Sequence, residues 1–144
     1  MKLPIKTGLI GYGLGGKCFH APFIATLPQY ELTCVVERRN NESQDRYPYV
    51  KVIRSVEELL ADNSIELIVV TTPNNTHFPF AKQALNAGKH VVVDKPMTVT
   101  SAEAMELIEL ARQTKKILSV YQNRRYASDA LTIKKVLSQN LLGT

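Results

Sequence analysis

Short runs of apolar residues, rich in Val and Ile, recur along the chain. Branched apolar side chains pack well on a pleated sheet, so these runs predict β-strands. The predicted strands are residues 7–11, 31–37, 51–54, 65–71, 90–94 and 117–121. The run IELIVVT at 65–71 is almost continuously apolar, which indicates a central strand that is covered on both faces.

Between these strands, apolar positions recur at the spacing of an α-helix. The predicted helices are residues 15–27, 56–63, 75–87, 101–111 and 129–139. Ser55 is placed to cap the second helix, with Glu58 at the capping-box position. Strands and helices that alternate in this way predict an α/β fold of the Rossmann type, a doubly wound parallel sheet with helices on both faces.

The helix predicted at 101–111 has two candidate apolar faces. The first face consists of Met105, Ile108 and Ala111, and the second of Leu107 and Leu110. Both have helical spacing, so the pattern leaves both open.

Length and composition indicate an ordinary globular domain. The chain has 144 residues, of which 44% are hydrophobic and 22% are charged. It contains no apolar run long enough to cross a bilayer, and its start lacks the features of a signal peptide. The two cysteines, Cys18 and Cys34, argue against a disulfide framework. We therefore expect a cytoplasmic protein without membrane contact.

The chain carries an excess of positive charge. Lys and Arg outnumber Asp and Glu by 18 to 13, which gives a formal net charge of +5. The basic residues are spread along the chain in pairs, as is typical of a solvated surface. We therefore expect no nucleic-acid partner and no metal site, whereas a phosphate-bearing cofactor would use part of the excess.

The segment GYGLGG at 11–16 has the pattern G-x-G-x-x-G. Such a pattern also occurs in turns that bind nothing, but here it follows an apolar strand and opens a helix. In a dinucleotide site, the first glycine permits the sharp turn, the second lets the pyrophosphate approach and the third lets the helix pack closely. The helix N-terminus then binds the phosphates. The residues that we expect to contact the dinucleotide here are Gly11, Tyr12, Gly13, Leu14 and Gly16.

Glu37 lies at the end of the second predicted strand, at the spacing from the glycines that the fingerprint expects. A carboxylate there accepts hydrogen bonds from the adenosine ribose, which favours NAD. Arg38 and Arg39 leave alternatives open, because a guanidinium suits a 2′-phosphate or the face of the adenine, and simple surface charge fits equally well. The expected cofactor is NAD or NADP, with a slight preference for NAD.

Three further segments extend this pattern. They are TTPN at 71–74 followed by His77, DKP at 94–96, and YQNRR at 121–125. Together with GYGLGGKCFHAPFI at 11–24, they resemble the Gfo/Idh/MocA family of sugar and polyol oxidoreductases over essentially the whole chain. The phrase KCFHAP at 17–22 and the NRR run resemble in particular its scyllo-inositol-dehydrogenase-like branch.

The resemblance implies a cofactor contact at the end of the fourth strand. The residues that would line the cofactor near its nicotinamide are Thr71, Thr72, Pro73 and Asn74. His77 would lie close by, although a histidine at a helix start without a catalytic part fits as well. His20 is expected to pack on or near the first helix, and we assign it no chemistry.

The resemblance also implies a catalytic lysine. Asp94 and Lys95 match the family's Glu-Lys-Pro motif, with a carboxylate that is shorter by one methylene. Lys95 would point to the junction of nicotinamide and substrate, and Asn123 and Arg124 would border the same pocket.

The position of Lys95 alone supports this role. Ligands of open α/β sheets bind at the carboxyl ends of the strands, and an ammonium there can stabilise the alkoxide that forms as hydride leaves carbon. The alternative is a surface lysine that precedes a proline.

The expected organisation is a single NAD(P)-binding domain at 1–144. Members of the family carry a second, C-terminal substrate domain, which we expect to be absent from this chain. We therefore expect a fragmentary form that binds the nucleotide, is poor at turnover and forms a homo-oligomer when full length. The expected substrate is a small sugar or polyol, which the sequence does not identify.

Two other functions fit parts of the pattern. A non-catalytic regulator that senses NAD(P) would keep the fold without needing Lys95. A methyltransferase would share the glycine-rich turn and the acidic residue after the second strand, but it would not explain the DKP and NRR segments.

Overall fold

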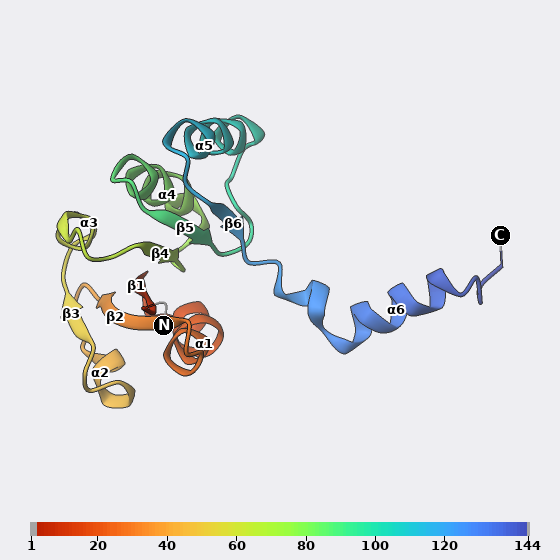
Figure 1. Cartoon of the computed structure of the whole chain (residues 1–144), viewed down its shortest axis with the longest axis horizontal. Coiled ribbons are helices and arrows are strands. Elements are labelled where there is room, and N and C mark those ends of the chain that lie inside the picture. The colour runs from red at the N-terminus through yellow and green to blue at the C-terminus, as the bar shows by residue number, and fades with distance from the viewer. Residues whose placement is uncertain (1–2, 144) are drawn as a thin grey trace.

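The computed structural model describes residues 3–143. Six strands form one parallel sheet in the order β3-β2-β1-β4-β5-β6 (Figure 1). The strands are β1 (Ile5–Ile10), β2 (Tyr30–Val36), β3 (Lys51–Ile53), β4 (Leu67–Val70), β5 (His90–Val93) and β6 (Leu118–Val120). The order reverses between β1 and β4, which confirms the predicted doubly wound Rossmann sheet.

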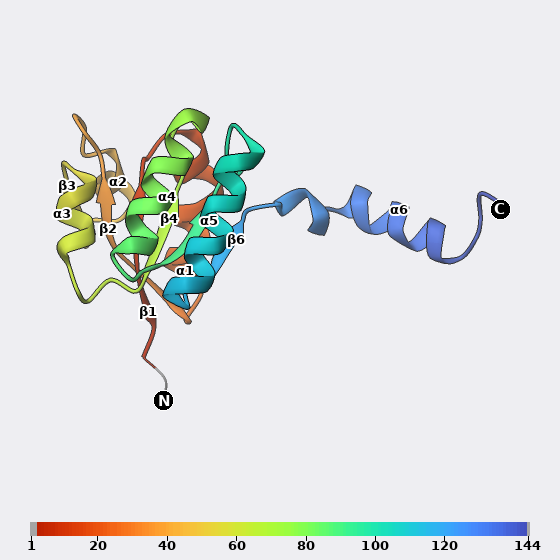
Figure 2. The same cartoon turned by 90° about the horizontal axis from the view of Figure 1, so that it is seen from above.

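The helical segments that precede β6 connect the strands and cover both faces of the sheet, and two more follow β6 (Figures 1 and 2). They are η1 (Gly15–His20), α1 (Ala21–Thr26), α2 (Glu42–Arg46), α3 (Val56–Ala61), η2 (Asn74–Thr76), α4 (His77–Asn86), α5 (Ser101–Thr114), η3 (Asn123–Tyr126) and α6 (Ser128–Ser138). Helix α1 packs on one face, and α3, α4 and α5 pack on the other.

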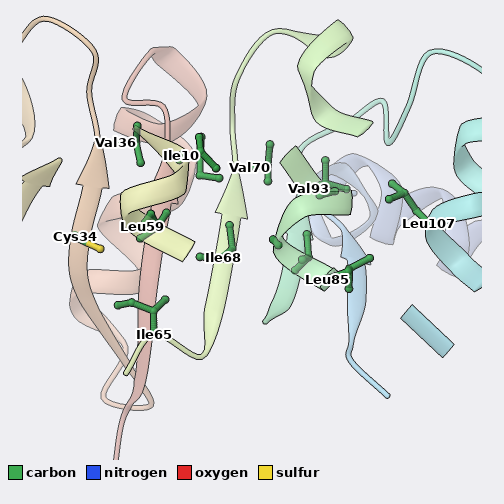
Figure 3. Close-up of a cluster of buried hydrophobic side chains, with 14 of the residues drawn as sticks. Ile10, Cys34, Val36, Leu59, Ile65, Ile68, Val70, Leu85, Val93 and Leu107 are labelled. Carbon is green, nitrogen blue, oxygen red and sulfur yellow. The ribbon is translucent and has the colours of Figure 1, made fainter. Parts of the chain in front are cut away.

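Neighbouring residues of the strands supply two separate hydrophobic cores. Ile68 and Val69 of β4 are both buried and belong to opposite cores, as expected of a strand that is covered on both faces. Figure 3 shows the larger core, where Leu59 of α3, Leu85 of α4 and Leu107 of α5 are fully buried over the sheet. The carboxyl ends of the strands are therefore held by packing on both sides.

Side-chain caps fix the starts of α3 and α5. Ser55 Oγ accepts the Glu58 N–H at 3.1 Å, as predicted. At α5, Thr100 Oγ1 accepts the Glu103 N–H at 3.2 Å, and Glu103 Oε2 accepts the Thr100 N–H at 3.0 Å, which completes a capping box. Helix α5 also continues to Thr114, beyond the predicted end.

The structure decides which face of α5 packs. Leu107 and Ala111 are buried, whereas Met105 is 65% and Ile108 is 53% exposed. Of the two alternatives, the face of Leu107 and Leu110 packs, together with Ala111 of the other face, because the sheet and α4 cover only one stripe of the helix. The short helix α2 has no apolar pattern of its own and was not predicted.

Helix α6 extends away from the sheet (Figures 1 and 2). It buries no residue, and Leu131, Ile133 and Leu137 are all at least half exposed. Across residues 3–143, no helix combines the length and apolar character that a bilayer crossing requires.

The contact between Gly8 of β1 and Leu59 gives a test of the packing. A Cβ on Gly8 would lie 2.5 Å from Leu59 Cδ1. We expect Gly8→Ala to lower the free energy of unfolding by about 1–3 kcal/mol through overpacking. In a protein that already carries Leu59→Ala, the same substitution should lower the free energy of unfolding by clearly less. Urea denaturation of the single and double variants measures this coupling. In a protein that carries Leu85→Ala instead, Gly8→Ala should still cause its full loss in the free energy of unfolding. An equal loss in wild-type, Leu59→Ala and Leu85→Ala proteins would contradict the contact between Gly8 and Leu59.

Candidate functional site

The glycine-rich turn follows β1 and closes tightly on itself. Gly11 has a φ of +94°, a conformation that glycine adopts without strain, and its N–H donates to Val36 O at 3.2 Å. A Cβ on Gly16 would lie 2.4 Å from Gly11 O and 3.0 Å from Thr71 Oγ1. The turn therefore excludes a side chain at position 16, as predicted for the close packing of helix on strand.

The opposite side of the turn is open. A Cβ on Gly13 would meet no atom within 4 Å, and Leu14 is 73% exposed. The helical segment η1 begins at Gly15, so its first N–H groups lie beside this open backbone. Such an arrangement of free N–H groups at a helix start suits an anion.

Tyr12 does not line the open side of the turn. It is 8% exposed and packs in the core beneath, with Leu9 and Val35. Burial raises the pKa of its hydroxyl, which therefore stays protonated. Tyr12 supports the turn from below.

Glu37 directly follows β2, as predicted, but its carboxylate is committed within the chain. Oε2 accepts the Glu42 N–H at 3.0 Å, and Oε1 accepts the Ser43 N–H at 2.9 Å together with the Ser43 hydroxyl. The residue is 7% exposed. Glu37 thus binds the first two N–H groups of α2, and this contact explains a helix that the sequence pattern did not predict.

The loop after Glu37 is positively charged and held in place. Arg38 and Arg39 are exposed. Arg54 donates to Glu37 O and Asn40 O, both at 2.7 Å. The open rim beside the end of β2 therefore presents guanidinium groups, while the carboxylate points inward.

The segment after β4 lies against the glycine-rich turn. The Thr71 hydroxyl donates to Gly11 O at 2.9 Å, and the Thr76 hydroxyl donates to Thr72 Oγ1 at 2.7 Å. Pro73 and Asn74 are on the exposed side of this segment. The predicted cofactor residues at 71–74 therefore lie beside the predicted phosphate turn.

His77 joins the loops that follow β4 and β5. It is 1% exposed, with Nδ1 2.7 Å from Pro96 O and Nε2 2.8 Å from Thr72 O. A neutral imidazole donates its single N–H to one of these two carbonyl oxygens, and only an imidazolium donates to both. His77 therefore fixes the segment after Lys95 relative to the segment after β4.

Asp94 and Lys95 follow β5 at the same edge of the sheet. Asp94 Oδ1 accepts the Lys95 N–H at 2.8 Å, and a Cβ on Gly15 would lie 3.0 Å from Asp94 Oδ2. The Asp94 carboxylate thus packs against the glycine-rich turn. Lys95 itself is exposed, and its side chain contacts no acceptor within the part of the chain that the structure describes.

Asn123 lies in the wall of a groove. This groove has a volume of about 760 Å³ and runs between α1 and the segment after β6, with Phe19, Tyr121 and Asn123 in its walls. Arg124 forms an ion pair with Asp129 instead. The structure therefore brings Lys95 together with Asp94 and the turn, while Asn123 lines the groove after β6 and the Arg124 side chain pairs with Asp129.

His20 is a site residue to which the sequence assigned no chemistry. It is 4% exposed at the end of η1, with Nε2 3.9 Å from Asp94 Oδ2. A histidine a few residues beyond the glycines was the signal in the sequence, but only the fold brings it to the end of β5.

The chain is similar to known oxidoreductases over nearly its whole length. Residues 5–122 match the family model GFO_IDH_MocA, described as the oxidoreductase family with an NAD-binding Rossmann fold. The chain is 50% identical to the uncharacterized oxidoreductase YdgJ of Escherichia coli (strain K12) over 96% of this chain and 40% of that protein. It is 41% identical to the scyllo-inositol 2-dehydrogenase (NADP(+)) IolW of Bacillus subtilis (strain 168), over 96% of this chain and 38% of IolW.

Solved structures agree with the sequence relatives. An oxidoreductase from Bacillus cereus superposes with a TM-score of 0.88 at 34% identity and covers 96% of this chain and 41% of its own. Biliverdin reductase from Synechocystis sp. PCC 6803, in complex with biliverdin and NADP⁺, superposes with a TM-score of 0.84 at 28% identity, over 94% of this chain and 43% of its own. The chain thus spans about 40% of the length of IolW and YdgJ. By its matched motifs, its strand order and these relatives, the chain belongs to the Gfo/Idh/MocA oxidoreductase family, as an NAD(P)-binding Rossmann domain.

Proposed function

We propose that this chain binds NADP(H) on its glycine-rich turn, as part of an enzyme that exchanges hydride with a hydroxyl group of a sugar or cyclitol. The observation that carries the proposal is the open backbone at Gly13, beside the start of η1, above a turn that is otherwise closed. The names of relatives support the substrate class, since IolW is a scyllo-inositol 2-dehydrogenase. The substrate site belongs to a part of the protein outside residues 1–144 in this proposal.

The described residues fit a dinucleotide at the carboxyl ends of β1, β2, β4 and β5. The turn receives the pyrophosphate, the rim after β2 receives the adenosine end, and the segment after β4 receives the nicotinamide end. The cofactor contacts that we assign are Gly11, Gly13, Leu14, Gly16, Arg38, Thr71, Thr72, Pro73 and Asn74. Tyr12, Glu37, His77 and Asp94 support these contacts from within the fold.

The hydrogen bonds of Glu37 favour NADP over the NAD that the sequence pattern favoured. Both oxygens of the carboxylate already accept hydrogen bonds from α2, so a ribose hydroxyl would compete with three donors. The exposed guanidinium groups of Arg38 and Arg39 suit a 2′-phosphate. IolW carries NADP(+) in its name, and the Synechocystis biliverdin reductase structure contains NADP⁺.

Lys95 is the residue that we assign to the chemical step. The bound nicotinamide accepts or donates the hydride. In the oxidising direction the Lys95 amine accepts the proton of the reacting hydroxyl, and the ammonium that results stabilises the oxygen; in the reducing direction the ammonium returns this proton to the alkoxide. Because Lys95 is exposed in this chain, the exclusion of water from it depends on the substrate and on the part of the protein that binds it. A cytoplasmic location and a homo-oligomeric full-length protein stay predictions.

The substitution Gly13→Ala tests whether the glycine-rich turn binds phosphate or has only a structural role. Because nothing lies within 4 Å of this Cβ position, Gly13→Ala should leave the free energy of unfolding within about 1 kcal/mol of wild type. The same methyl group would meet the pyrophosphate, so we expect the affinity for NADPH to fall by about tenfold or more. Nicotinamide fluorescence and urea denaturation measure the two effects. Unchanged affinity in a folded Gly13→Ala variant would exclude the turn as the phosphate site.

Replacement of Arg38 tests the choice of cofactor. We expect Arg38→Gln to weaken NADPH binding by about tenfold, as for the loss of one charge-assisted hydrogen bond, and to leave NADH binding nearly unchanged. Titrations at one fixed ionic strength compare the two cofactors. Arg112→Gln on the outer surface of α5 is the control for net charge. Equal losses for NADH and NADPH would argue against a 2′-phosphate contact at Arg38.

Lys95 can be tested in a chimera in which this chain replaces the matching 38% of IolW. We expect the chimera to reduce NADP⁺ with scyllo-inositol, and Lys95→Ala to lower kcat by about 10²–10⁴-fold with little change in NADPH affinity. Absorbance of NADPH follows the reaction. An active chimera that keeps full turnover without Lys95 would overturn the role of Lys95. A folded chimera that binds NADPH but has no turnover would favour the alternative, a non-catalytic dinucleotide sensor.

A further inference from the structure

His20 is a buried residue at the edge of the candidate site. It is 4% exposed, and its Nε2 has no partner among the described residues. A buried polar atom without a partner costs about 1–3 kcal/mol, a cost that an apolar side chain of similar size would avoid. The position therefore calls for an explanation beyond packing.

Among the described residues, Asp94 is the charged group that acts on His20. Nε2 lies 3.9 Å from Asp94 Oδ2 at the end of β5, which is too long for a hydrogen bond and short enough for a strong charge interaction. The ring of Tyr121, the residue after β6, packs against the imidazole with the centroids 4.1 Å apart. The Tyr121 hydroxyl is turned away and donates to Phe19 O at 3.0 Å. Tyr30 lines the same small hollow from β2.

Asp94 connects this histidine to both functional elements of the site. Its Oδ1 accepts the Lys95 N–H, and its Oδ2 packs against Gly15 of the glycine-rich turn. A dinucleotide on that turn brings its phosphate charge toward a carboxylate whose ion-pair partner within residues 3–143 is His20. Negative charge added next to Asp94 favours the charged form of the imidazole.

We propose that His20 takes up a proton when the dinucleotide binds, and that the resulting His20–Asp94 ion pair makes His20 a positioning residue for Lys95. This inference rests on the proposed binding of NADP(H). In the free chain, burial lowers the pKa of His20 while the Asp94 carboxylate raises it, so the ring is mostly neutral at neutral pH. In the protonated ring, Nε2 carries an N–H that can donate to Asp94 Oδ2. The carboxylate is then held by His20 at Oδ2 and by the Lys95 N–H at Oδ1.

The coupling between His20 and Asp94 can be measured without any cofactor. NMR titration of the imidazole signals, assigned with single histidine variants, gives the pKa of His20 in the free chain. We expect Asp94→Asn to lower this pKa further, because it removes the carboxylate that raises it. An unchanged value in folded Asp94→Asn protein would overturn the pairing. His90 lies at the far end of β5, and its titration should be the same in both proteins.

Proton uptake on binding is the second measurement. We expect saturation with NADP⁺ to raise the titration midpoint of His20 by about one pH unit, which corresponds to a gain in affinity of up to about tenfold on acidification. Calorimetry in buffers of different ionisation enthalpy counts the protons directly. His20→Gln should lose the uptake and keep the fold, whereas His90→Gln should retain the uptake. The 2′-phosphate of NADP⁺ titrates in the same range, but it does so equally in all variants.

The outcomes separate the two proposals. NADP⁺ binding with an unchanged His20 would overturn the role of His20 and leave the cofactor site intact. No binding of NADP⁺ or NADPH by wild-type chain would overturn the cofactor proposal, and the inference on His20 would fall with it.

Discussion

The first helical segment can approach β1 only because Gly16 carries no side chain. A Cβ there would lie 2.4 Å from Gly11 O, well inside the distance at which backbone atoms repel. The close approach places the start of η1 beside the ends of β1 and β4, where the Thr71 hydroxyl also donates to Gly11 O. The open face at Gly13, the contact of Asp94 with Gly15 and the inward position of His20 all depend on this one approach.

Polar side chains hold the loops at this edge of the sheet. Glu37 binds the first N–H groups of α2, and His77 joins the segments after β4 and β5. These side chains are buried, so their hydrogen bonds lie in surroundings of low dielectric constant and resist rearrangement. The exposed groups, Arg38 and Lys95, are thereby carried on loops with fixed positions. The buried carboxylate of Glu37 thus supports the loops of the site, and the exposed cations of Arg38 and Lys95 are free to contact a ligand.

The sequence by itself determined the class of fold and the place of the site. Apolar runs separated by helical spacing specify a parallel sheet because each strand needs cover on both faces, and the bounds of the strands agree to within two residues. The glycine pattern located the turn, since its requirements are local and steric: a positive φ at Gly11 and no Cβ at Gly16. Ser55 as a helix cap was predictable for the same reason, because the contact spans three residues.

Only the tertiary structure decided where the charged groups point. Glu37 has the spacing of a residue that binds the ribose, but its carboxylate binds the start of α2. This helix has no apolar pattern from which the sequence could predict it. The choice of Leu107 over Met105 on α5 depended on which stripe the sheet and α4 cover. The pairing of His20 with Asp94 joins residues far apart in the chain, because the fold places the end of η1 beside the carboxyl end of β5. Local spacing fixes backbone geometry, whereas the direction of a long polar side chain depends on partners that folding alone brings within reach.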